Sequence, residues 1–225
     1  TANYASAFGL ASCATCLEST AVGFYAKATS NYATSVGFTT IASGCQTSSF
    51  GHHAQAIGHY SVAVGRYTCS AGNYGSAFGF YSCATGNDSA AIGQYARATG
   101  AYSTAIGVYC AVASGACSLA VGWKTCATGA DSAAVGRCAV ASNVCTIAVG
   151  WNACATGQHA SAFGRVNTAS GNFSTSVGYQ NTASYSGASA FGAVSKALGE
   201  DSTAVGRNSC TFGGDATAVG RQTCA

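Results

Sequence analysis

The stretch NDSAAIGQYARATG, residues 87–100, is followed directly by AYSTAIGVYCAVASG, residues 101–115, which repeats the same pattern. In each stretch a small residue, an apolar residue and a glycine follow one another. Seven or eight residues later, a second glycine follows Ala-Thr or Ala-Ser. Repetition at a fixed short period is the pattern that decides a repeat fold, so we examined the rest of the chain for it.

Glycine keeps almost one register from end to end of the chain. When the sequence is divided into heptads with glycine at position 7, all 30 glycines hold that place except Gly75, Gly187 and Gly214. The register shifts once, by a single residue, between Gly107 and Gly115. Position 6 is apolar in one heptad and Thr or Ser in most of the next. The repeating unit is therefore a pair of heptads, about 14 residues long.

A period this short predicts a solenoid, in which each unit packs only against its neighbours. About 14 residues are too few for a pair of helices, but they suit a coil with two strands of about five residues and two turns. We therefore predict an all-β protein, a parallel β-solenoid (β-roll) of about 16 coils with two short strands per coil. The prediction places residues 1–225 in one uncapped solenoid domain, with a one-residue insertion near residues 108–115.

Side chains alternate between the two faces of a strand, so the small residues at positions 3 and 5 are predicted to point inward. These positions hold mostly Ala, Ser and Thr. The predicted core is therefore an Ala/Ser core, and the two sheets are predicted to lie closer than the usual ~10 Å. The larger residues at positions 4 and 6 are then predicted to point outward.

The two outer faces are predicted to differ. On one face, position 6 carries Val, Ile or Phe throughout, and a contiguous apolar patch of this kind typically marks an interaction surface. The other face carries Thr and Ser there, and holds Lys27, Arg97 and Lys196, which we take as the basic residues that point off a strand. The predicted oligomer or partner face consists of Phe8, Val22, Val36, Phe50, Val64, Phe78, Ile92, Ile106, Val121, Val135, Val149, Phe163, Val177, Phe191, Val205 and Val219.

Composition excludes several classes of protein. Only 7% of the residues are charged, which is too few to solvate the outer faces of helices in a mixed α/β enzyme. With 48% hydrophobic residues the chain is not a disordered polar tract. No apolar run is long enough to span a membrane, and a net charge of +3 is too small for a nucleic-acid footprint. We expect neither nucleic-acid binding nor membrane insertion.

The motif S-x-A-[VI]-G followed by x-x-A-x-A-T-G, as in residues 87–100, resembles the head repeats of trimeric autotransporter adhesins, the YadA-like family. The resemblance covers essentially the whole chain. It implies a left-handed parallel β-roll, assembly of three rolls into a trimer, and a head that attaches a bacterial surface to host matrix or to other cells. The implied location is extracellular or on the cell surface. The 13 cysteines are unusual for this family.

Cysteines form a partial ladder on the second face. Cys69 and Cys83 lie one coil apart, as do Cys210 and Cys224, and a spacing of ~4.8 Å between adjacent strands lies within the Cα range that a disulfide tolerates. These four residues are candidate disulfide partners, with free small side chains as the equally weighted alternative. Disulfides would favour an oxidising, extracellular setting.

The tyrosines, the Cys-x-x-Cys pair and the Ser, His and Asp residues do not predict a binding or catalytic site. Tyr67, Tyr81, Tyr95 and Tyr109 are each one coil apart, and stacking at the coil edge explains them better than ligand binding does. The Cys-x-x-Cys of residues 13–16 has no second pair at zinc-ligand spacing. Ser, His and Asp are too frequent in the repeat for any triad to stand out. We predict no enzyme, no catalytic residue, no metal site and no cofactor.

Two functions remain. The first is a structural or adhesive extracellular fibre that associates with itself, as a trimer or a head-to-tail filament, and contacts host matrix, a glycan or a cell surface. The alternative is an ice-binding (antifreeze) β-solenoid, which would need one strictly repeated Thr-rich strip. Because joining Ala225 to Thr1 reproduces an internal repeat, we also expect a segment of a longer solenoid or a subunit that stacks head to tail.

Overall fold

The structure, a computed structural model, describes residues 4–225, and all regular elements there are β-strands joined by turns. The chain divides into two compact units, Thr1–Ser114 and Gly115–Ala225. In both units a coil contributes one long strand and one short strand, as the sequence predicts for a parallel β-solenoid, except that β31 is followed by an isolated bridge at Cys224. Within the described part of the chain, no helix is long and apolar enough to cross a membrane.

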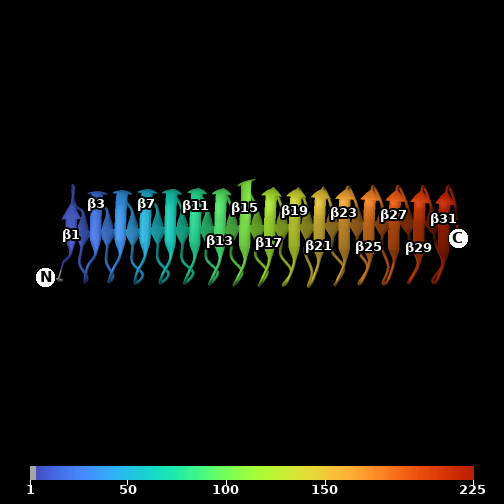
Figure 1. Ribbon diagram of the computed structural model, residues 1–225, viewed down its shortest axis with the longest axis horizontal. Coiled ribbons are helices and arrows are strands. Elements are labelled where there is room, and N and C mark those ends of the chain that lie inside the picture. Colours follow the sequence, from blue (N-terminus) through green and yellow to red (C-terminus); the bar gives the residue numbers. More distant parts are fainter. Residues whose placement is uncertain (1–3) are drawn as a thin grey trace. The chain divides into compact units, whose positions relative to one another are not determined.

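Unit 1 contains two parallel sheets, one of long strands and one of short strands, each with its strands in chain order (Figure 1). The long strands are β1 (Ser6–Phe8), β3 (Thr20–Phe24), β5 (Thr34–Phe38), β7 (Ser48–His52), β9 (Val62–Arg66), β11 (Ser76–Phe80), β13 (Ala90–Gln94) and β15 (Thr104–Tyr109). The short strands are β2 (Cys13–Ala14), β4 (Lys27–Ala28), β6 (Ile41–Ala42), β8 (Gln55–Ala56), β10 (Cys69–Ser70), β12 (Cys83–Ala84), β14 (Arg97–Ala98) and β16 (Val112–Ala113).

Unit 2 has the same two kinds of sheet. Its long strands are β17 (Leu119–Trp123), β19 (Ala133–Arg137), β21 (Ile147–Trp151), β23 (Ser161–Arg165), β25 (Thr175–Tyr179), β27 (Ser189–Ala193), β29 (Thr203–Arg207) and β31 (Thr217–Arg221). Its short strands are β18 (Cys126–Ala127), β20 (Val140–Ala141), β22 (Cys154–Ala155), β24 (Thr168–Ala169), β26 (Thr182–Ala183), β28 (Lys196–Ala197) and β30 (Cys210–Thr211).

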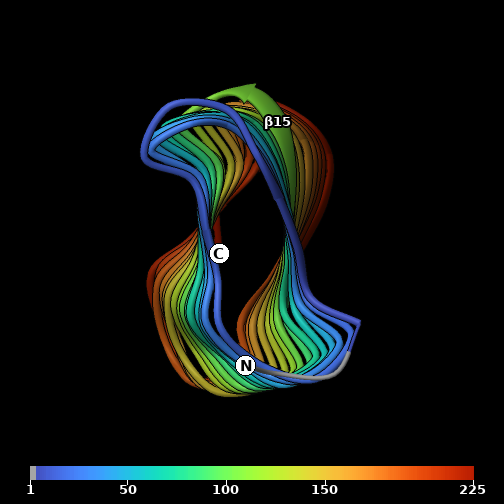
Figure 2. The same cartoon turned by 90° about the vertical axis from the view of Figure 1, so that its left-hand side faces the viewer.

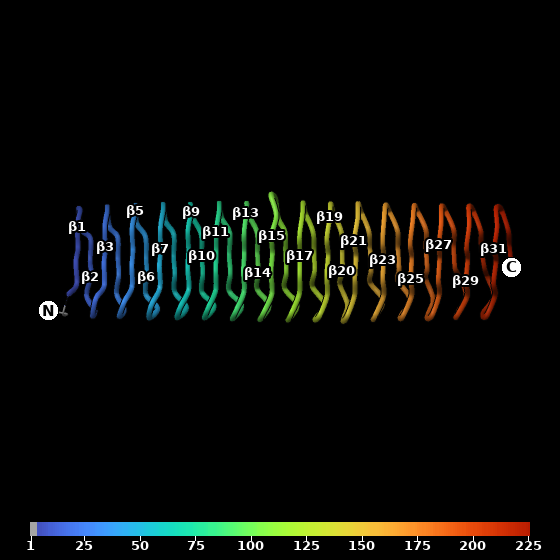
Figure 3. Tube along the Cα trace, in the orientation of Figure 1, coloured from blue at the N-terminus to red at the C-terminus, as the bar shows by residue number. Residues whose placement is uncertain are grey.

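The strands differ in length from the prediction. Long strands have five residues in most coils, but every short strand has two, so the expectation of about five residues in each was wrong for the second strand. The chain leaves the short strand early because the following residues already turn. The residue at position 2 of nearly every heptad has a φ of 50–60°, in the left-handed region, as at Tyr25 and Tyr32. These paired turns bring the chain back once per coil, as the Cα trace shows (Figure 3).

Glycine at position 7 is required by the close approach of successive coils. A Cβ on Gly93 would overlap the carbonyl oxygen of Gly107 one coil later, and Gly93 itself has a φ of +121°. In the other turn, a Cβ on Gly86 would overlap the Gly100 carbonyl oxygen. The repeated glycine is therefore a steric requirement of coil stacking, which explains why it recurs at both turns.

The core consists of small side chains, as the sequence predicts. Positions 3 and 5 are buried in both units, as shown by Ser103 and Ala105 in unit 1 and Ala134 in unit 2, all 0% exposed. Several buried serines donate a hydrogen bond from the hydroxyl group to the preceding turn. For example, Ser103 Oγ donates to the Gly100 carbonyl over 2.6 Å. Alanine buries little apolar area, so much of the order comes from hydrogen bonds between coils, such as Thr20 N to Ala33 O at 2.8 Å.

The inserted residue lies at the end of β15. This strand has six residues, and Cys110, one position later than usual, takes the left-handed turn conformation. Figure 2 shows β15 extending over the turn beyond the preceding coils of unit 1. Val108 is 73% exposed, and the Cys110 N to Gln94 O hydrogen bond lengthens to 3.3 Å. The coil thus absorbs the extra residue as a local bulge without losing its inward register, because Ala111 and Ala113 remain buried.

Candidate functional site

The outward side of the long-strand sheet is named here the apolar face, defined by the position-6 residues predicted above. In unit 1 these residues are register partners from Phe8 and Val22 through to Ile92 and Ile106. Phe50, Phe78, Ile92 and Ile106 are each about 37–41% exposed, and the valines are half-buried. Because each lies next to a buried position-5 residue, the row points away from the core.

Unit 2 has a row of its own, in which the position-6 residues are register partners from Val121 to Val219. Its members from Val121 to Val205 are half-buried, and Val219 is 64% exposed. Each unit therefore presents an unbroken apolar row whose outer surface is open to solvent. A row of this kind is suited to contact with another apolar surface.

The short-strand sheet carries the cysteine pairs. Cys69 and Cys83 are register partners, and Arg97 is the next residue in the same row. In unit 2, Lys196 pairs with Cys210, which forms an isolated bridge with Cys224. All 13 cysteines are present as free thiols. In both units, two adjacent thiols thus have a cationic side chain one strand away.

The two pairs differ in acidity. The Cys69 thiol donates a hydrogen bond to Cys83 and lowers the pKa of Cys83 to about 6, an effect that burial opposes and the Arg97 charge reinforces. The same hydrogen bond, with burial, raises the pKa of Cys69. Burial and the neighbouring Cys224 raise the pKa of Cys210, against the effect of Lys196. Cys83 is therefore the thiol best prepared to react as a thiolate.

The predicted tyrosine ladder is present in part. Tyr67 and Tyr81 stack with ring centroids 4.7 Å apart, and Tyr81 and Tyr95 stack at 5.4 Å. Tyr95 and Tyr109 instead meet edge to face at 5.8 Å, because the insertion in β15 displaces the last ring. On the opposite turn, Tyr60 and Tyr74 stack at 4.9 Å.

Five arginines lie at the ends of long strands, where the sequence analysis placed none. They are Arg66 in unit 1, and Arg137, Arg165, Arg207 and Arg221 in unit 2. The statement that only Lys27, Arg97 and Lys196 point off a strand was wrong, because the long strand continues through glycine to position 1. The signal was present in the sequence as Gly-Arg, preceded each time by Val or Phe.

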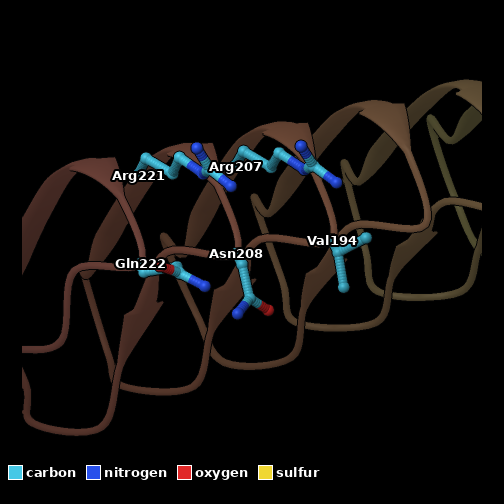
Figure 4. A pocket seen from close by; sticks show the side chains of 5 residues that line it. All are labelled: Val194, Arg207, Asn208, Arg221 and Gln222. Atoms are coloured by element: carbon cyan, nitrogen blue, oxygen red, sulfur yellow. The ribbon is translucent and has the colours of Figure 1, made fainter.

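Two of these arginines line a shallow surface pocket of about 210 Å³ together with Val194, Asn208 and Gln222. Figure 4 shows the Arg207 and Arg221 side chains extending in the same direction from neighbouring coils, with the two amides below them. Both guanidinium groups are exposed and have no carboxylate partner in the described part of the chain. Elsewhere the arginines lie over aromatic rings, with Arg137 Cζ 4.8 Å from the Trp123 ring centroid and Arg165 Cζ 4.2 Å from that of Trp151.

Among residues 4–225 there is no group of three or more His, Cys, Asp and Glu side chains arranged to hold a metal ion. His52 and His53 are instead part of the aromatic stack, where the His52 ring lies 4.8 Å from Phe38 and the His53 ring 5.0 Å from Tyr67. The two histidines therefore contribute to ring stacking at the turns.

Comparison with known proteins agrees with this architecture. No curated protein matches the chain. The sequence pattern of the family described as YadA head domain repeat (2 copies) matches residues 17–40, 42–68, 84–109, 127–153, 155–181 and 186–209. These matches cover more than half of the chain and follow the coils of the β-solenoid. The chain therefore belongs to the family of YadA head domain repeats.

Proposed function

We propose that this chain is an extracellular, structural head segment that associates with other copies of itself through the apolar face and mediates attachment to a surface. YadA head domains are structural adhesin domains rather than enzymes. The observation that carries the proposal is the unbroken, solvent-open row of Val, Ile and Phe in each unit. An exposed row of this kind in water favours association, because burial of apolar area stabilises by roughly 25 cal/mol per Å².

A trimer is the assembly that the family favours, and stacking of copies head to tail into a filament is the second form of self-association that we propose. The opposite face fits this role less well, since the short-strand sheet places Lys27, Arg97 and Lys196 in its outward row. Charges buried at an interface without partners are costly. The apolar face, which carries no charged residue at positions 4 and 6, is therefore the surface that we expect to be covered.

Sedimentation of the purified protein at micromolar concentration tests this function. We expect a stable trimer for the wild type, and a shift to monomer when Val135→Glu and Val149→Glu are combined. The matched control combines Val112→Glu and Val140→Glu, which change half-buried valines in the outward row of the short-strand sheet. Equal loss of association in both double variants, or a stable wild-type monomer, would contradict the proposal.

Attachment is tested separately from assembly. The surface bound is a matrix protein, a glycan or a cell surface, and immobilised collagen is the first probe, with uncoated wells as the control. We expect retention of the assembled wild type and reduced retention of the monomeric Val135→Glu/Val149→Glu variant, because an assembled head presents several identical sites at once. Equal retention of both proteins would separate attachment from self-association and contradict this part of the proposal.

Ice binding is the less favoured function. The apolar face is interrupted by Phe8, Phe50, Phe78, Phe163 and Phe191. The other face is interrupted by Lys27, Arg97 and Lys196, so neither face offers a strictly repeated Thr strip. A thermal-hysteresis measurement at micromolar protein checks this directly. We expect no hysteresis gap, and a clear one would favour ice binding over the adhesive head.

A further inference from the structure

The arginines and the carboxylates of unit 2 lie on opposite edges of the coil. Arg137, Arg165, Arg207 and Arg221 each end a long strand, at β19, β23, β29 and β31. Asp131, Glu200, Asp201 and Asp215 lie in the turns that lead into long strands, and all four are exposed. Because the long strands are parallel, all their ends lie along one edge and all their starts along the other. We name these rows the basic edge and the acidic edge.

The two edges do not neutralise one another within a coil. A five-residue strand is about 17 Å long, beyond the Debye length of about 8 Å at physiological ionic strength. Arg207 and Arg221 are also register partners, and like charges on neighbouring strands destabilise a sheet. The basic edge therefore carries an electrostatic cost that no carboxylate of the described chain relieves.

The carboxylates on the acidic edge occur at the same coils as these arginines. Asp201 and Asp215 precede β29 and β31, the strands that end on Arg207 and Arg221, and Asp131 precedes β19, which ends on Arg137. A second copy aligned coil by coil would thus bring each of these acids to the level of an arginine. Arg165 is the exception, since the turn before β23 carries Gln158 and His159.

Symmetry decides which edges can meet when two apolar faces pack together. If the copies run parallel, related by an axis along the solenoid, the basic edge of one lies beside the acidic edge of the next at the same height. If they run antiparallel, related by an axis along the strands, basic meets basic and acidic meets acidic. Charge complementarity is therefore available only to the parallel, in-register arrangement.

We propose that the basic edge of unit 2 docks against the acidic edge of a second, parallel copy, and that the Arg207–Arg221 pocket receives the Asp201 and Asp215 carboxylates of that copy. This inference rests on the proposed self-association through the apolar face and specifies its direction and register. Guanidinium groups pair with carboxylates in a defined, often bidentate geometry, and the Asn208 and Gln222 amides provide further donors at the pocket. The contact between Arg165 and Trp151 holds that side chain in place along the same edge.

Charge reversal with rescue tests the pairing. One variant combines Arg207→Glu and Arg221→Glu, and a second combines Asp201→Lys and Asp215→Lys. Each variant places like charges across the edge contact, so we expect self-association to weaken at least tenfold. The quadruple variant restores opposite charges with the edges exchanged, and we expect it to associate within a few-fold of the wild type. Circular dichroism and thermal melting establish that each variant is folded.

Mixing the two double variants gives a second test, because its result depends on the number of copies in the closed oligomer. When the two double variants are mixed, favourable contacts form only where the two types alternate. An alternating arrangement closes in a ring with an even number of copies and fails in a trimer, so we expect the mixture not to rescue the trimer. Full rescue by mixing would contradict a trimer but support edge pairing.

The outcomes separate this inference from the proposed function. A monomeric wild type contradicts self-association itself. If the wild type and both double variants associate equally, or if the quadruple variant is no better than either double variant, the apolar face acts without edge pairing and this inference is wrong. If heparin, used as a polyanionic probe, binds the wild type while association is insensitive to both charge reversals, the pocket recognises a free anionic polymer and the inference is overturned.

Discussion

Units 1 and 2 use the same coil but stabilise it with different ladders of side chains. At the turn that follows the long strand, unit 1 stacks Phe24, Phe38 and His52 with centroids 4.8–4.9 Å apart. At the corresponding turn in unit 2, arginine lies over tryptophan. Inside the coil, unit 2 carries a buried asparagine ladder, Asn167 and Asn181, where unit 1 has Ala, Ser and Thr.

This difference shows which part of the repeat determines the fold. The glycine ladder and the small residues at position 5 are common to both units, because backbone contact between coils leaves no room for larger groups. Turn residues contact their sequence neighbours and their counterparts one coil away, as His52 does with His53 and Phe38, so different stacking side chains are compatible with the same turn. The stacked turn residues and the asparagine ladder are thus the features through which stability and surface chemistry can differ between the two units.

The largest expected effect is the same in both units. Ala91 and Ala134 are 0% exposed, and Ala91→Leu or Ala134→Leu would insert three carbons between closely packed sheets. We expect each to lower the free energy of unfolding by about 3 kcal/mol, the upper end of overpacking costs. Thermal melting is the measurement, with Ala90→Thr and Ala133→Thr as controls on the neighbouring outward positions. Similar melting temperatures for the Leu and Thr variants would be incompatible with the inward assignment.

The second prediction concerns buried side-chain hydrogen bonds, which unit 2 has at Asn167 and which unit 1 lacks at the matching residue, Ser82. Asn167 Nδ2 donates to the carbonyls of Phe163 and Gly178, and its Oδ1 accepts from the Asn181 backbone N–H at 2.9 Å. Asn167→Ala removes all three bonds in a buried site, so we expect a loss of about 2 kcal/mol in the free energy of unfolding. At the matching position of unit 1, the buried Ser82 hydroxyl has no hydrogen-bond partner. Ser82→Ala is the control, and denaturant unfolding should show no loss for it.

The third prediction compares the cysteine pairs. Because the pKa of Cys83 is lowered to about 6, its thiolate predominates at pH 7, and its alkylation rate should fall about tenfold per pH unit below pH 6. The raised pKa of Cys210 means that its rate should increase only at higher pH. Mass spectrometry of iodoacetamide-labelled peptides measures both. Cys69→Ala removes the hydrogen-bond donor and should slow Cys83 at pH 7, and identical pH profiles for Cys83 and Cys210 would argue against the assignment.

The same pairs are proposed to form disulfides between adjacent strands. With oxidised glutathione, the Cys83 thiolate attacks one sulfur of the reagent and releases one glutathione thiolate. Cys69 then loses its proton and attacks the Cys83 sulfur, which releases the second thiolate, so two protein thiols are oxidised and one disulfide is reduced. We expect peptides linked through Cys69 and Cys83, and through Cys210 and Cys224, after proteolysis. Linkage to distant cysteines instead would exclude register pairing as the determinant.

Most of the fold was predictable because its determinants repeat. The glycine register, the inward positions 3 and 5 and the one-residue insertion could all be read from spacing. The short second strand could not, since its heptad has the same length, the same small residues at positions 3 and 5 and the same closing glycine as the heptad of the long strand. The glycine register alone predicts a turn at Arg207 and Arg221, and only the hydrogen-bonded ladder places them at strand ends. The Asn167 ladder required side-chain geometry that sequence spacing does not provide.

The smallest expected effect distinguishes two tyrosines within unit 1. Tyr81 and Tyr102 both have φ in the left-handed region, at 53° and 57°, where a non-glycine residue costs roughly 1 kcal/mol. Tyr81 offsets this cost by stacking on Tyr67 and Tyr95, and aromatic pairs contribute about 0.5–1.5 kcal/mol. Tyr102 is 65% exposed.

Asparagine adopts the left-handed conformation more readily than tyrosine, so replacing either tyrosine relieves backbone cost, but only Tyr81 loses a stack on both sides. We therefore expect Tyr102→Asn to stabilise the protein by about 0.5 kcal/mol and Tyr81→Asn to destabilise it by about 1 kcal/mol. Thermal melting of the two variants alongside the wild type measures the difference in sign. If both substitutions stabilise the protein, stacking of the tyrosine rings contributes little to the free energy of unfolding, and the backbone hydrogen bonds and the glycine ladder account for the stability of the coils. Opposite signs mean that stacking across coils is what allows tyrosine at a turn position that otherwise disfavours it.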